Sequence, residues 1–205
     1  MFKNKLILFI IISCLNFTNF IHSEDIQHAT NFAQPLNVLS LSDIWENIDT
    51  YEQIIVFEID GDSEVEFGIT DLEDTGLTLD TLQNQLQNFA DGIAPTIPFI
   101  DAQVEDEEDK IDYAFIKLNP LFERININGI EWLKALCTYV GTIESSTYEN
   151  DVLVNQSKKY TPINSVTYFT IIDNHLYIAD FSVPSKKYAI YEQLFQTTML
   201  NLYRN

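Results

Sequence analysis

Residues 165–202 carry the clearest pattern of hydrophobic and polar positions in the chain. Two runs rich in β-branched and aromatic residues, 166–172 and 175–181, flank the pair Asp173-Asn174. Both turn residues tolerate positive φ, which a two-residue hairpin turn requires. Pro184 then ends strand pairing and suits the first turn of a helix. The following residues predict an amphipathic helix, because apolar side chains recur every three or four positions at Tyr188, Tyr191, Phe195, Met199 and Leu202.

A second hairpin is predicted in the first half of the chain. Residues 54–59 begin as an unbroken apolar run, and residues 64–69 alternate between acidic and apolar side chains. Alternation places successive side chains on opposite faces of a strand. We therefore expect one face to be buried and the other, with Glu64 and Glu66, to face outward. The buried face would consist of Val65, Phe67 and Ile69.

Two helices are predicted on either side of this hairpin. Ser42 or Asp43 is placed to cap a short helix over residues 44–51, since oxygen side chains accept from free amides of a first turn. Residues 79–89 form a longer amphipathic helix, capped by Thr78 or Asp80 and ended at Gly92. Its apolar stripe is Leu79, Leu82, Leu86, Phe89 and Ile93.

The middle of the chain predicts a third hairpin. Residues 113–116 look like the start of a strand, and Asn128-Gly129 lies between the apolar runs 122–127 and 130–140. Asn-Gly is a strong turn signal, so we favour strands on both sides of it. The composition of residues 130–140 also fits a helix. Residues 145–159 are polar and are predicted to be a loop.

The first residues are typical of a secretory signal peptide. Lys3 and Lys5 precede an apolar core over residues 6–12, and charge returns at Glu24. We expect cleavage after Ser23, export to the periplasm or the medium, and no transmembrane segment after processing. The alternative is a lipid anchor on Cys14, because Ile11-Ile12-Ser13-Cys14 resembles a loose lipobox. The expected organisation is a signal peptide at 1–23, a tether at 24–41 and one domain at 42–205.

The charge is concentrated in the first half of the chain that remains after cleavage. Residues 24–112 hold 23 acidic residues and one basic residue, whereas residues 113–205 hold eight of each. A net charge of −22 repels phosphates, which disfavours nucleic acid and anionic membranes as partners. It attracts cations and basic proteins, and it also keeps a protein soluble.

Two acidic segments are candidate binding sites. Asp60, Asp62 and Glu64 have the alternate spacing of a calcium loop, but Val65 and Asp71 stand where such a loop needs glycine and glutamate. A solvated hairpin tip is the competing interpretation. Five consecutive carboxylates form a candidate docking site for Lys or Arg of a partner, or a solubilising loop, at Glu105, Asp106, Glu107, Glu108 and Asp109.

Recognisable catalytic machinery is missing from the sequence. After cleavage only His28, His175 and Cys137 remain of the histidines and cysteines, and Cys137 lies in an apolar run that predicts burial. The sequence contains no zinc-protease, nucleophile-elbow or phosphate-loop motif. We therefore expect no enzyme, no cofactor and no disulfide.

The C-terminal pattern resembles that of the Mog1/PsbP-like superfamily. The hairpin is followed by the spacing F-x-x-P-x-x-x-Y-x-x-Y-x-x-L-F, here Phe181, Pro184, Tyr188, Tyr191, Leu194 and Phe195. Ile127-Asn128-Gly129 matches an upstream turn of that group, and the resemblance covers residues 105–203. It implies an α+β fold, in which helices flank both faces of an antiparallel sheet in an α/β/α sandwich. The superfamily includes bacterial exported proteins and lipoproteins, and it shares no catalytic residues.

These features together predict a non-enzymatic, exported, acidic protein of the cell envelope that binds a partner, most simply a basic protein. The alternatives are a carrier of a small ligand or divalent cation, and a periplasmic immunity protein against a basic toxin. Charge complementarity in the last case would mainly raise the association rate. The sequence does not indicate an oligomeric state.

Overall fold

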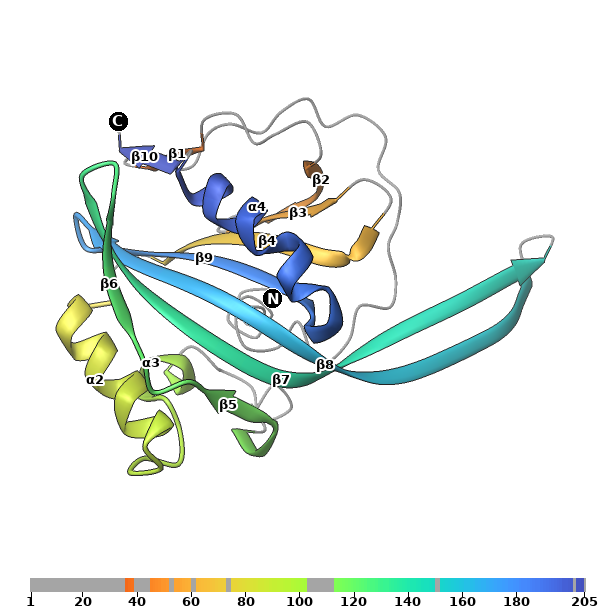
Figure 1. The fold of residues 1–205 in the computed structure, drawn as a ribbon, viewed down its shortest axis with the longest axis horizontal. Helices are drawn as coiled ribbons and strands as arrows, with labels where there is room; N and C mark the ends of the chain where they lie inside the picture. The colour runs from red at the N-terminus through yellow and green to blue at the C-terminus, as the bar shows by residue number, and fades with distance from the viewer. Residues whose placement is uncertain are drawn as a thin grey trace.

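An eight-stranded antiparallel sheet organises the chain, which confirms the predicted α+β class (Figure 1). The computed structural model describes residues 36–38, 45–51, 54–59, 62–72, 75–102, 113–149, 152–200 and 202–204. The strands are β1 (Leu36–Val38), β2 (Trp45–Tyr51), β3 (Ile54–Ile59), β4 (Asp62–Leu72), β5 (Ile116–Leu118), β6 (Glu123–Ile127), β7 (Ile130–Glu149), β8 (Val152–Ile172), β9 (His175–Pro184) and β10 (Leu202–Arg204). The sheet order is β2-β3-β4-β9-β8-β7-β5, β6 also pairs with β7, and β1 pairs separately with β10.

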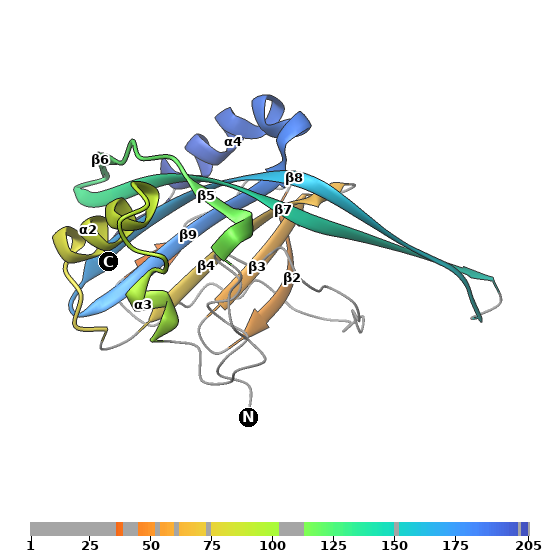
Figure 2. The ribbon, with the colours of Figure 1, turned by 90° about the horizontal axis from the view of Figure 1, so that it is seen from below.

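Helices cover the two faces of the sheet (Figures 1 and 2). The α-helices are α2 (Leu79–Ala90), α3 (Pro98–Asp101) and α4 (Tyr188–Leu200), and the 3-10 turns are η3 (Tyr113–Phe115) and η4 (Ser185–Lys187). Helix α4 lies on one face, and α2 and α3 lie on the other. We call these the α4 face and the α2 face. None of the described helices has the length and apolar character needed to cross a membrane.

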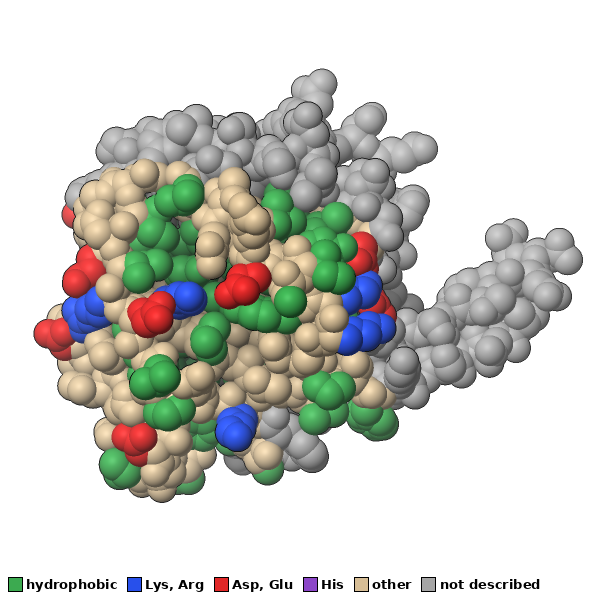
Figure 3. Space-filling view, in the orientation of Figure 1, with side chains coloured by type: hydrophobic (Ala, Val, Ile, Leu, Met, Phe, Trp, Pro, Cys, Tyr) green, Lys and Arg blue, Asp and Glu red, His purple; other side chains and the backbone are tan. Residues whose placement is uncertain are grey.

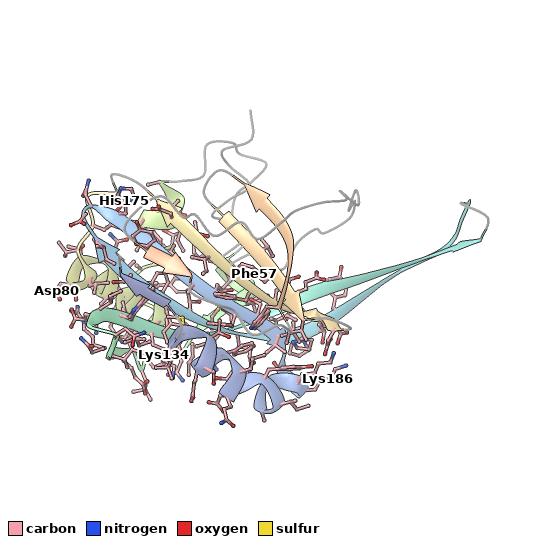
Figure 4. All side chains as sticks on the ribbon, turned by 90° about the horizontal axis from the view of Figure 1, so that it is seen from above. Phe57, Asp80, Lys134, His175 and Lys186 are labelled. Atoms are coloured by element: carbon pink, nitrogen blue, oxygen red, sulfur yellow. The ribbon has the colours of Figure 1, made fainter. Side chains whose placement is uncertain are left out.

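The alternation of the strands divides the core between these faces. Phe67, Phe181 and Phe195 join the sheet to α4, with Phe57 close by in the same cluster (Figure 4). Leu176 and Ile178, on the same strand as Phe181, instead pack with α2 on the α2 face. The predicted inward positions of β4 are confirmed, since Val65, Phe67 and Ile69 are buried.

The capping residues and the apolar stripe predicted the position of α2 correctly. Thr78 caps its start, accepting from the amide of Thr81, and Gly92 follows the end with a φ of +71°. Leu82 and Leu86 are buried on the sheet, as the stripe predicted. The stripe was wrong at its end, because Ile93 lies beyond the last helical turn and is 74% exposed.

The two predicted turns after residue 120 are also confirmed. Asn128 and Gly129 have φ values of +53° and +82°, and Asp173 and Asn174 have +50° and +68°. These left-handed conformations give the tight turns that join β6 to β7 and β8 to β9. Residues 130–140 are therefore strand and not helix, in line with the favoured interpretation.

The prediction of a loop over residues 145–159 was wrong. Strands β7 and β8 stay paired from Leu133 with Phe169 to Glu149 with Val152. Their outer parts form a long two-stranded arm that leaves the body of the molecule (Figures 1 and 2). The polar composition hid these strands because neither face of the arm is covered by another element of the described chain.

Three further expectations were wrong. Residues 45–51 form strand β2 and not a helix, and the Trp45 indole donates to Thr198 of α4 at 3.1 Å. Leu36–Val38, expected within a tether, pairs with Leu202–Arg204, so the helix ends before Leu202. Residues 113–115 form a 3-10 turn, and the strand begins only at Ile116. The predicted signal peptide and Cys14 lie outside the described residues.

Candidate functional site

The acidic run lies outside the residues that the structure describes, and so does Asp60. Glu105, Asp106, Glu107, Glu108 and Asp109 therefore stay a prediction from the sequence. The described part of the chain does place the other candidate ligands, Asp62 and Glu64, and it also contains a carboxylate cluster that the sequence did not predict.

Asp62 and Glu64 bind a cation of the chain itself. The Lys187 ammonium lies 2.6 and 2.8 Å from the two Asp62 oxygens and 2.7 Å from Glu64, and the Tyr191 hydroxyl donates to Asp62 at 2.8 Å. Partial burial opposes ionisation of Asp62, but the donors Lys187 and Tyr191 outweigh it and lower its pKa. No group of three metal-ligating side chains occurs among the described residues.

This ion pair fixes the start of the C-terminal helix to the β3–β4 hairpin. Lys187 thus pairs with carboxylates of the acidic half, while Lys186 is exposed at the end of the molecule remote from His175 (Figure 4). The lysine opposes the helix dipole at this position. Its two carboxylates on the hairpin provide the compensating interaction.

We expect Lys187→Gln to lower the free energy of unfolding by about 1 kcal/mol, at the upper end for partly exposed pairs. Asp62→Asn in the same background should then cost little more, because its ionic partner is already gone and asparagine can still accept from Tyr191. Urea unfolding of the four proteins in this cycle measures the coupling. Lys186→Gln is the matched control, since Lys186 is exposed.

The pH dependence of this pair has a defined sign. The folded pKa of Asp62 lies below its ordinary value of 3.8, so its stabilisation is present above that pH and is lost as the pH falls through the folded pKa. A coupling free energy that is the same in acid and at neutral pH would contradict the ionic account.

The most unusual arrangement is a buried carboxylate on the α2 face. Asp180 in β9 accepts hydrogen bonds from Ser165 and Thr167 at 2.5 Å each and from Ser182 at 2.8 Å. The Tyr139 hydroxyl donates to Ser182 at 3.2 Å. These five residues, which we call the Asp180 cluster, come from three neighbouring strands and are all buried.

Burial raises the pKa of Asp180 to about 6, although the hydroxyl donors from Ser165, Thr167 and Ser182 act to lower it. Glu66 lies on the neighbouring strand, opposite Ser182. Burial raises its pKa to about 8, and the charges of Glu58 and Asp180 add to the shift. Glu66 was expected to face outward, but it is only partly exposed. The site can therefore bind and release protons near neutral pH.

Of two other polar features, one lies at the β8–β9 turn and the other is a cleft that reaches Ser165 of the Asp180 cluster. His175 and Asp71 are 2.8 Å apart at the β8–β9 turn, on the α4 face, and His175 stacks on Tyr177. An open cleft of about 570 Å³ lies between β5 and the start of α4, where Lys117 is the one charged side chain among its described lining residues.

Cys137 is buried, as predicted. Burial raises the pKa of its thiol to about 12, with a further contribution from the charge of Asp180. A thiol with such a pKa is protonated at neutral pH and is a poor nucleophile. Cys137 therefore belongs to the core of the α2 face and to no reactive site.

One signal in the sequence could have revealed the Asp180 cluster. Asp180 is an acid within a largely apolar, buried strand. It occupies the same alternating set of positions as Leu176 and Ile178. An acid at such a position needs hydrogen-bond partners. The partners Ser165 and Thr167 belong to the hairpin strand paired with it, at two positions of the same parity.

Comparison with known proteins identifies the fold. No protein-family model and no curated protein sequence matches the chain. The structure is similar to that of cyanobacterial PsbP (CyanoP) from Synechocystis, with a TM-score of 0.51 and 12% identity over 93% of this chain and 99% of that one. The yeast Ran-binding protein Mog1p is similar with a TM-score of 0.42 and 9% identity, over 82% and 89%. The fold is thus Mog1/PsbP-like, as the C-terminal pattern predicted.

Proposed function

We propose that the chain is an exported, non-enzymatic binding protein of the cell envelope, whose acidic half attracts a basic protein. The observation that carries the proposal is the charge division at residue 112, with a net −22 before it and zero after it. A field of one sign raises the rate of association with an oppositely charged partner. The signal-peptide pattern supports export.

The two halves of the chain contribute differently to the described structure. The neutral second half supplies five of the eight strands of the sheet, β5 to β9, and the helix α4 that covers one face. Two partly buried carboxylates of the first half, Asp62 and Glu64, are already paired with Lys187 within the fold. The five consecutive acids at 105–109 carry the densest charge of that half, which makes them the leading candidates for a partner.

Affinity capture from the native envelope at increasing salt tests the proposal. We expect one stoichiometric partner with a high isoelectric point, released as the ionic strength rises, because screening weakens exposed charge pairs. Glu105→Gln with Glu107→Gln and Glu108→Gln should lower both affinity and salt dependence. The matched control removes three carboxylates from the other half, by Asp151→Asn, Asp173→Asn and Glu192→Gln.

Two results would contradict the proposal. One is an equal loss of affinity in both triple variants, which would assign the effect to total charge. The other is the absence of a partner combined with a higher melting temperature in Ca²⁺, which would favour the carrier of a divalent cation instead.

A further inference from the structure

The arm is the least supported part of the described fold. On the β7 side, the last neighbouring strand is β5, whose Ile116 pairs with Tyr139. On the β8 side, β9 ends with Pro184 opposite Ile163. Beyond these positions β7 and β8 pair only with each other within the described chain. An isolated two-stranded ribbon is only marginally stable in water, and a third strand changes this.

The two edges of the arm differ in how readily they can pair with another strand. The outer part of β8 contains Lys158, Lys159 and Pro162. Lysine and proline are the residues that natural proteins place on strand edges to prevent pairing. The outer part of β7, residues 140–149, contains neither, and five of its ten residues are valine, threonine, isoleucine or tyrosine, which favour strands. The edge of β7 is therefore the one left open to another strand.

We propose that this edge pairs with the same edge of a second copy of the chain, forming a four-stranded antiparallel ribbon about a two-fold axis. The register that uses the whole open edge is centred on Ser145 and places Gly141 opposite Glu149 of the second copy. The two-fold symmetry then makes the same contact twice. Glu149 of the second copy would then lie close to Ile116, where β5 begins, and in line with that strand.

The charges on β7 are compatible with this register. They disfavour a register whose centre is shifted by one residue toward the body. Centred on Ser145, the pairing sets Glu144 opposite Ser146, so no carboxylates stand directly across from each other. Centred on Glu144, it would place two glutamates face to face, which destabilises a strand pair. The nine residues of the overlap separate the acidic bodies by roughly 30 Å, beyond the ~8 Å screening length at physiological salt.

The base of the arm carries apolar surface that such a pairing would cover. Val140 is 43% exposed and Tyr160 is 69% exposed, and Val140 pairs with Pro162 in the sheet. Figure 3 shows apolar side chains on this face at the base of the arm. In the proposed register, Tyr148 of the second copy comes opposite Thr142, which is itself paired with Tyr160. Cross-strand pairs of this kind stabilise a sheet.

Sedimentation velocity across the micromolar range tests the proposal with the intact chain. We expect a monomer–dimer equilibrium. Ser146→Glu adds two like-charge pairs across the axis and should weaken the dimer about ten-fold, whereas Ser146→Lys adds two opposite-charge pairs and should strengthen it. Gln156→Glu is the matched control, because Gln156 pairs with Ser146 within the arm but lies on β8, and it should leave the equilibrium unchanged.

Disulfide trapping tests the register separately. Ser145→Cys places two thiols across the axis and should give a covalent dimer under mild oxidation, whereas Ser157→Cys, at the paired position on β8, should not. A chain that is monomeric at every concentration, a Ser146→Lys variant that dissociates as readily as Ser146→Glu, or equal trapping by both cysteines overturns the proposal. None of these results bears on binding of a basic partner.

Discussion

Replacing Asp180 with asparagine is expected to remove the share of the decline in stability that Asp180 causes between about pH 4 and pH 7, and to leave the variant the more stable protein at neutral pH. Burial raises the folded pKa of Asp180 from 3.8 to about 6. The unfolded chain therefore releases the proton first, and folding becomes less favourable as the pH rises between the two values. With about 1.4 kcal/mol per pKa unit, the ionised carboxylate costs roughly 3 kcal/mol at neutral pH.

Asparagine suits this site because it keeps the hydrogen-bond geometry. Its carbonyl oxygen can accept from Ser165 and Thr167, as the carboxylate oxygen does. Its amide can donate to the Ser182 oxygen, which already accepts from Tyr139. Alanine would instead leave these buried hydroxyls without an acceptor, which costs about 1–3 kcal/mol for each unsatisfied group.

Urea unfolding at a series of pH values measures the effect as the difference between the wild type and the variant. That difference cancels the general effect of the chain's net charge on stability. Asp173→Asn is the matched control, since it makes the same chemical change at an exposed turn outside the Asp180 cluster. A parallel pH profile for Asp180→Asn and the wild type would sink the assignment.

The same variant tests the coupling to Glu66. The charge of Asp180 is one cause of the raised pKa of Glu66, after burial and the charge of Glu58. Removing it should lower the pKa of Glu66, which carboxyl-carbon NMR titration can follow directly. The two carboxylates then act as one proton-binding unit of the α2 face, so their titrations are coupled.

Local signals explain why much of the fold could be predicted. The turn at Asp173-Asn174 needs two left-handed residues, and few residue types tolerate that conformation. The stripe of α4 follows the helical period, and Phe195 and Met199 are indeed buried. In both cases the information lies within a few neighbouring residues, where sequence patterns are most reliable.

The features that were missed depend on distant contacts. Trp45 was expected in a helix, but its indole reaches Thr198, 153 positions away, and that packing decides for a strand. The arm has no apolar alternation to find, because pairing between its own two strands maintains it. The Asp180 cluster forms only once the register of three strands is known. The sequence contains the residues that form each of these features, but it does not show which distant residues lie next to them.

Phe181→Ala is expected to be strongly destabilising, lowering the free energy of unfolding by about 3–5 kcal/mol. The Phe181 ring stacks on Phe67 with centroids 4.5 Å apart and contacts Phe195 of α4 at the same distance, with Tyr168 at 6.1 Å. Removing the ring leaves a cavity where β4, β8, β9 and α4 meet. The loss is a large part of the roughly 5–15 kcal/mol that stabilises a typical domain.

Denaturant unfolding measures this loss. A shifted midpoint with an unchanged dependence of the unfolding free energy on denaturant reports lower stability and not a change in the unfolded state. Phe181→Leu should cost clearly less, since it fills most of the space but loses the ring stacking. Ile190→Ala, on the exposed side of α4, should change stability by no more than about 0.5 kcal/mol. If Phe181→Ala and Ile190→Ala had similar midpoints, α4 would not be packed on the sheet through Phe181. The motif residues that give the C-terminal segment its resemblance would then need a role other than packing.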